Sequence, residues 1–192
     1  MLVIMSVHMS LNKITLRIKD QIPTLNMIVP VYAVISFVVY GWTLYWFVYE
    51  IPGLLNYLLL SEILVMYLYT LTVNLLESLI ILFLSLALCV LLPKKWFYKG
   101  FVFRGTLLSL FVTVYFFGLI LRRSQIMVFS TNMVNWFPVF LLIAFLMIGL
   151  LEKIPFLKKM VESFADRMTV FLYINIPVSV LAVITVLIRS VL

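Results

Sequence analysis

Residues 27–49 have the sequence MIVPVYAVISFVVYGWTLYWFVY, in which 23 consecutive positions carry no charged side chain. A helix needs about 20 apolar residues to cross the roughly 30 Å hydrocarbon layer of a bilayer. The segment is therefore long enough to span a membrane. Tyrosines and tryptophans gather in its second half, and Glu50, Pro52 and Gly53 follow, which indicates a membrane–water interface and then a turn.

The composition of the whole chain extends this interpretation. Of the 192 residues, 66% are hydrophobic and 11% are charged, whereas soluble domains have about 45–50% apolar and about 25% charged residues. In a bilayer the backbone must satisfy its own hydrogen bonds, which leaves helices or a closed barrel. Barrel strands alternate in polarity over about 10 residues, but this chain has longer unbroken apolar runs. We expect an all-α, polytopic membrane helical bundle that forms a single domain over residues 1–192.

Further apolar runs predict more spans, and two basic segments predict helices that lie on the membrane surface. In residues 10–22 apolar side chains recur every three or four positions, with Lys13, Arg17 and Lys19 off that stripe, and residues 154–166 have a similar pattern. The five expected transmembrane helices are 27–49, 66–92, 105–121, 134–151 and 168–188, and the two expected cytoplasmic interfacial amphipathic helices are 10–22 and 154–166.

The distribution of basic residues decides how many spans lie between residues 51 and 92. This segment contains only Glu62 and Glu77 as charges and is long enough for one span or two. With one span, 11 of the 14 Lys and Arg residues fall on one side of the membrane, which the positive-inside rule makes the cytoplasm. With two spans the cluster at 94–104 would change sides and the distribution would become nearly even. We therefore expect one span, with residues 54–65 forming an interfacial or partly re-entrant segment on the outer face.

This arrangement places the N-terminus in the cytoplasm and the C-terminus outside a plasma membrane or bacterial inner membrane. The partners that we expect are the lipid bilayer and other membrane helices, in a homo-oligomer or a hetero-complex. The net charge of +7 does not indicate nucleic acid, because the basic residues lie in the short segments between apolar runs. The start of the chain stays open among Met1, Met5 and Met9.

Glu77 is the strongest candidate for a functional residue, because it lies near the middle of the span 66–92. A charge at that depth costs at least about 2.5 kcal/mol. One interpretation is a proton or ion pathway in which the carboxyl is protonated at rest, and the other is a packing interface. We favour packing, since a pathway usually uses a second intramembrane charge. The polar residues expected on the same helical face are Tyr67, Thr70, Asn74 and Ser85.

Two other groups of residues are weaker candidates. Asn175 precedes Pro177 in the span 168–188, where a kink would free backbone carbonyls beside a site. Arg122 and Arg123 fall on the outer side, where they would contact an anionic group or simply end a helix in solvent; we prefer the second interpretation.

No motif in the sequence indicates an enzyme. One histidine, His8, and one cysteine, Cys89, argue against a metal site or a histidine-based triad, and we expect neither a cofactor nor catalytic residues. The first hypothesis is a non-catalytic assembly or accessory subunit of a membrane complex. The alternative is a small transporter or channel component that uses Glu77 to bind a proton or cation. A lipid-linked enzyme acting through Arg122 and Arg123 is a third, weaker hypothesis.

Overall fold

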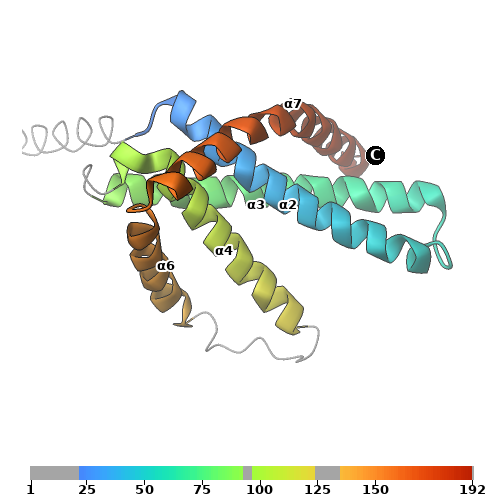
Figure 1. Cartoon of the computed structure of the whole chain (residues 1–192). Coiled ribbons are helices and arrows are strands. Elements are labelled where there is room, and N and C mark those ends of the chain that lie inside the picture. Colours follow the sequence, from blue (N-terminus) through green and yellow to red (C-terminus); the bar gives the residue numbers. More distant parts are fainter. Residues whose placement is uncertain (1–21, 93–96, 124–134, 192) are drawn as a thin grey trace, which may run out of the picture.

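A computed structural model describes residues 22–92, 97–123 and 135–191, and all the regular structure in these residues is helical. The interfacial helix expected at residues 10–22 lies almost entirely outside the described residues. The elements in chain order are α2 (Leu25–Leu54), α3 (Leu60–Leu91), the short 3-10 helix η1 (Tyr98–Gly100), α4 (Phe101–Arg123), α6 (Phe137–Leu151) and α7 (Pro155–Val191) (Figure 1).

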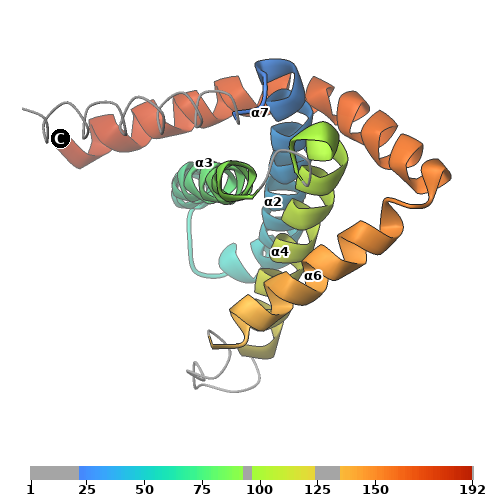
Figure 2. The ribbon, with the colours of Figure 1, turned by 90° about the vertical axis from the view of Figure 1, so that its left-hand side faces the viewer.

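Helix α2 has the most extensive contacts with other helices, and it makes them with α3, α4 and α7. In Figures 1 and 2, α3 flanks α2, α4 and α6 lie on one side of it, and α7 arches over the other side. Phe37 of α2 packs against Phe164 and Phe171 of α7, with ring centroids 6.4 and 4.8 Å apart. The side chains of Val31 and Val34 are fully buried, so α2 is the helix against which α3, α4 and α7 pack.

Helices α2 and α3 form a hairpin that extends beyond the expected spans. Helix α2 continues to Leu54 and α3 begins at Leu60. Residues 54–65 are therefore the end of one helix, a short turn and the start of the next, instead of a separate interfacial or re-entrant segment. The carboxylate of Glu62 accepts a hydrogen bond of 2.8 Å from the backbone N–H of Leu59. This contact satisfies one of the free amides at the start of a helix, which explains why α3 begins there.

The second half of the chain also differs from expectation. Helix α6 has 15 residues, so at 1.5 Å per residue it is about 22 Å long, less than the hydrocarbon layer. The expected interfacial helix 154–166 and the span 168–188 form one continuous helix of 37 residues, α7. No proline or glycine separates the two segments, and a change from charged to apolar side chains does not interrupt backbone hydrogen bonding.

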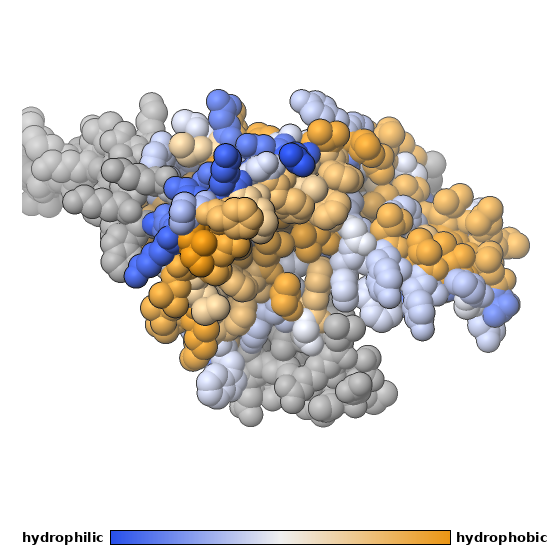
Figure 3. All heavy atoms as spheres, viewed as in Figure 1, coloured by the Kyte–Doolittle hydropathy of each residue, from blue (hydrophilic) through white to orange (hydrophobic). Residues whose placement is uncertain are grey.

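Four helices in the described residues, α2, α3, α4 and α7, are long and apolar enough to cross a membrane. Large apolar side chains are exposed along α3, α6 and the C-terminal half of α7, and the hydrophobic surface covers much of the molecule in Figure 3. Exposed apolar patches of this extent mark contact with a membrane or a partner. The surface therefore fits a protein that lies in a bilayer.

The contact between α4 and α2 is close at Gly105. A Cβ atom at this position would lie 3.4 Å from both γ-carbons of Val31. We predict that Gly105→Leu lowers the stability of the folded protein by about 1–3 kcal/mol, because the added carbons overfill this contact. Thermal unfolding in detergent measures the effect. Gly118→Leu on the same helix is the control, since a Cβ there meets nothing within 4 Å. Equal melting temperatures for the two variants would contradict the close contact.

Candidate functional site

Polar side chains on one face of α2 join this helix to α3 and α7. Tyr32, Ser36, Tyr40 and Thr43 follow one another along α2 at steps of four, four and three residues, which places them on one face of the helix. Ser36 is buried, and each of the other three bonds to a neighbouring helix. The three bonded pairs are Tyr32 with Ser78 (3.4 Å between hydroxyl oxygens), Tyr40 with Ser179 (2.6 Å between hydroxyl oxygens) and Thr43 with Asn74 (3.0 Å from Oγ1 to Oδ1).

Asn74 is one of the two predicted polar residues of α3 that the structure buries, with 3% of its surface exposed. Its side-chain oxygen accepts the hydrogen bond from Thr43, and its side-chain nitrogen has no hydrogen-bond partner among the described residues. A buried polar group left without a partner costs about 1–3 kcal/mol. The bond from Thr43 satisfies the side-chain oxygen of Asn74 and leaves the nitrogen unsatisfied. Among the described helices, the side chain of Asn74 is therefore hydrogen-bonded to α2 alone.

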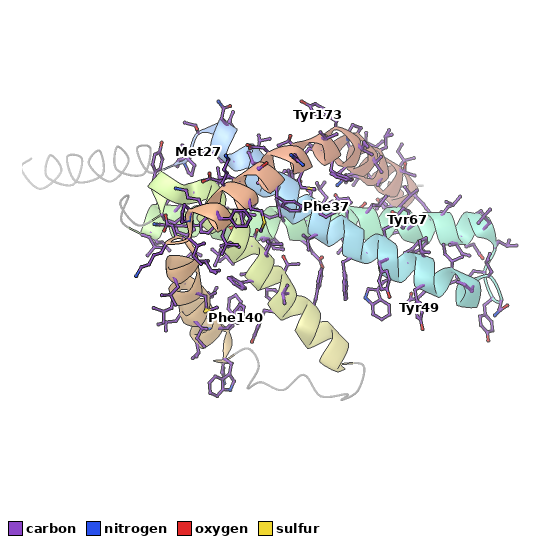
Figure 4. All side chains as sticks on the ribbon, viewed as in Figure 1. Met27, Phe37, Tyr49, Tyr67, Phe140 and Tyr173 are labelled. Carbon is purple, nitrogen blue, oxygen red and sulfur yellow. The ribbon has the colours of Figure 1, made fainter. Side chains whose placement is uncertain are left out.

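The contact of α2 with α7 involves Asn175 through its backbone. The hydroxyl of Ser179 lies 2.6 Å from the carbonyl oxygen of Asn175 and donates to it, while the hydroxyl of Tyr40 donates to Ser179. Pro177 lies inside α7 and cannot donate a backbone hydrogen bond to the carbonyl four residues earlier. The helix is bent (Figures 1 and 2), and Tyr173, four residues before the proline, lies near the crest of the arch (Figure 4).

Glu77 lies on the outer surface of α3 and makes no hydrogen bond or ion pair with the described residues. Its neighbours on that face, Val73, Leu76 and Ile80, are 50%, 57% and 66% exposed. We expected Glu77 to share a face with Asn74 and Ser85, but the structure separates them. The buried polar residues of α3 are Asn74, Ser78 and Ser85.

The remaining predicted residues are satisfied locally or lie outside the description. The hydroxyl of Thr70 donates to the carbonyl of Met66 at 2.9 Å, and that of Ser85 donates to Ile81 at 3.1 Å. Such bonds within one turn are common for Ser and Thr in helices. The ring of Tyr67 packs on Phe47, with centroids 4.5 Å apart. Arg122 and Arg123 are the last residues of α4, and their side chains lie outside what the structure describes.

A second polar contact joins α4 to the end of α6. The Nε atom of Arg104 donates to Oε2 of Glu152 at 2.9 Å, and the Nη2 atom donates to the same oxygen. The two side chains are 18% and 25% exposed. A Cβ at Gly100 would lie 3.1 Å from Oε1 of Glu152, so a glycine there leaves room for the ion pair. The sequence contains a signal for this pair that we missed. Arg104 immediately precedes the apolar run 105–121, and Glu152, of opposite charge, immediately follows the apolar run 134–151.

These observations define an all-helical protein with four helices long and apolar enough to cross a membrane. In the ranges that the structure describes, no three His, Cys, Asp or Glu side chains come together in a way that would hold a metal ion. Comparison with protein-family models, with curated proteins and with solved structures finds no match for this chain. The functional argument therefore rests on the residues themselves.

The Tyr40–Ser179 hydrogen bond gives a testable estimate of how strongly α7 is held. Hydrogen bonds between membrane helices contribute about 0.6 kcal/mol on average and about 1.7 kcal/mol at most. We predict a coupling energy in this range from a double-mutant cycle of Tyr40→Phe and Ser179→Ala, measured by unfolding in detergent. Tyr173→Phe is the control, because Tyr173 is 82% exposed. Additive effects of the two changes would show that the bond stabilises nothing.

Proposed function

We propose that this chain is a non-catalytic subunit that assembles with other membrane helices through the outer face of α3. The observation that carries the proposal is the position of Glu77, an ionisable side chain on an exposed apolar surface. An isolated charged group in the hydrocarbon layer is costly. A partner helix that donates a hydrogen bond or a positive charge to Glu77 removes this cost, and the surrounding apolar side chains supply the packing surface.

The interior of the chain supports assembly more than transport. Its buried polar residues are serines, threonines and one asparagine in the described ranges, and most of their hydroxyls bond to helix carbonyls or to neighbouring side chains. A proton path through a single chain needs a series of ionisable groups, and Glu77 points away from this interior. The alternative, a transporter or channel component, therefore requires Glu77 to bind its proton or cation between subunits.

The orientation that we propose keeps five crossings, with the N-terminus in the cytoplasm and the C-terminus outside a plasma membrane or bacterial inner membrane. Arg104, Lys153 and Lys158 lie where α4 begins, α6 ends and α7 begins. Because basic residues are retained on the cytoplasmic side, their common location supports this orientation. Helix α6 then counts as a short crossing, which a locally thinner bilayer accommodates at modest cost.

The first test replaces Glu77. We predict that Glu77→Leu prevents recovery of the protein in an assembly larger than the single chain, because the carboxyl is the polar contact to the partner. Size-exclusion chromatography with light scattering in mild detergent measures the assembly. The melting temperature of the separated chain stays the same or rises, since Glu77 makes no hydrogen bond or ion pair with the described residues. Val73→Leu on the same exposed face is the control.

Substitutions at Glu77 also distinguish the alternative function. If Glu77→Gln abolishes proton or cation flux in proteoliposomes and leaves the assembly intact, the transporter hypothesis replaces the assembly hypothesis. If Glu77→Leu leaves both the assembly and the flux unchanged, Glu77 has neither role and the proposal fails.

The orientation has its own test in a bacterial host. We predict that alkaline phosphatase fused after Leu192 is active, because five crossings from a cytoplasmic N-terminus place the C-terminus outside. Green fluorescent protein at the same position stays dark, since it does not mature there after export through the general secretion route. The opposite pair of results would show an even number of crossings, with α6 on one side of the membrane.

A further inference from the structure

An open cleft of about 730 Å³ runs along α6, and Leu92 at the end of α3, Phe97 before η1 and Arg104 of α4 complete its lining. The volume falls in the range of about 300–1,000 Å³ that is typical of small-ligand sites. Eight of its described lining residues are apolar, and six of these eight, among them Leu142, Phe145 and Leu146, belong to α6. The cleft is separate from Glu77, which lies on α3.

The floor of the cleft is held in place by aromatic packing. Phe97 is 1% exposed, and its ring centroid lies 6.0 Å from those of Phe101 and Phe145. The outer wall of the cleft, formed by Leu142 and Leu146, is exposed, because these side chains are 62% and 63% exposed. The cleft therefore has a fixed base and an apolar side that is open to the surroundings of α6.

The polar end of the cleft has an excess of positive charge. Arg104, Glu152 and Lys153 border it, and Glu152 is the only carboxylate among the lining residues. Since Arg104 already pairs with Glu152, the exposed ammonium of Lys153 is left to attract an anion. Figure 3 shows hydrophilic surface at the end of the molecule where α6 meets α7, beside the hydrophobic surface over α6.

We propose that this cleft binds one anionic phospholipid of the surrounding bilayer, with an acyl chain along α6 and the phosphate at Lys153. An apolar slot with a cationic end is complementary to an amphiphile that has a negative headgroup. Basic pockets between membrane helices bind anionic headgroups in this way, and the flexible Lys side chain reaches the headgroup level readily. A bilayer lipid is the occupant because the open wall of Leu142 and Leu146 faces the same surroundings as the rest of α6.

The test uses native mass spectrometry of the full chain in detergent, with added phosphatidylglycerol or with phosphatidylcholine of the same acyl chains. We expect the wild type to retain phosphatidylglycerol in preference to phosphatidylcholine. Gly149→Phe fills the cleft and removes this binding, and a Cβ at Gly149 meets nothing within 4 Å, so the fold tolerates it. Gly118→Phe is the matched control, because its Cβ is equally free of neighbours.

The headgroup contact is tested by Lys153→Gln, a change at an exposed side chain that does not depend on filling the cleft. We expect phosphatidylglycerol to bind about fivefold more weakly, the loss typical of one Lys near an anionic surface. Lys159→Gln is the control, since Lys159 is exposed and does not border the cleft.

Two results would overturn the proposal. Undiminished phosphatidylglycerol binding in Gly149→Phe would place the lipid elsewhere on the surface. Equal retention of the two lipids, unchanged in Lys153→Gln, would show that the cleft has no preference for a negative headgroup. Neither result depends on the state of Glu77, so this test and the assembly test fail independently.

Discussion

A hydroxyl or amide in hydrocarbon has no water to bond to, and this constraint determines where α2 lies in the fold. Tyr32, Tyr40 and Thr43 are on one face of α2, and each of these side chains bonds to a neighbouring helix. The bonds go to α3 on one side and to α7 on the other. Apolar packing alone does not distinguish helix–helix contact from helix–lipid contact, because lipid tails are as apolar as leucine. The hydroxyl pairs therefore determine which surfaces of α3 and α7 face α2.

The same constraint distinguishes Glu77 from the ion pair of Arg104 and Glu152. Arg104 and Glu152 satisfy each other across the junction of α4 and α6, so this pair supports the local architecture and borders a cleft. Glu77 has no such partner within the described part of the chain. The proposal that a partner helix contacts Glu77 rests on this difference.

Much of the architecture follows from the sequence because apolar runs and their lengths are local properties. Helices α2 and α4 include the expected spans 27–49 and 105–121, and α3 includes all of the expected span 66–92 except its last residue, Leu92. The continuity of α7 was missed because a charge pattern was used to divide residues 154–188, although only proline and glycine interrupt a helix strongly. Pro155 falls in the first turn of α7, where it is tolerated.

The candidate site was predictable only in part. Asn74 and Glu77 are three positions apart, and a helical periodicity argument puts them on the same face. A sequence shows which of these two residues faces the interior only when the residues around them differ in polarity. The side chains on all sides of α3 are apolar, so the sequence does not distinguish Asn74 from Glu77. Ser78, one residue after Glu77, is the group that bonds to Tyr32. The pairing of Tyr40 with Ser179 joins residues 139 positions apart and has no local signal.

That long separation has a consequence for biosynthesis. The chain is made from the N-terminus onward, so α2 and α3 meet long before the ribosome reaches Ser179. Until then the Tyr40 hydroxyl has no partner from α7, and the face of α2 that α7 covers is open to other membrane segments. A chain terminated before α7 would therefore leave this polar face of α2 uncovered, whereas α7 covers it in the folded protein.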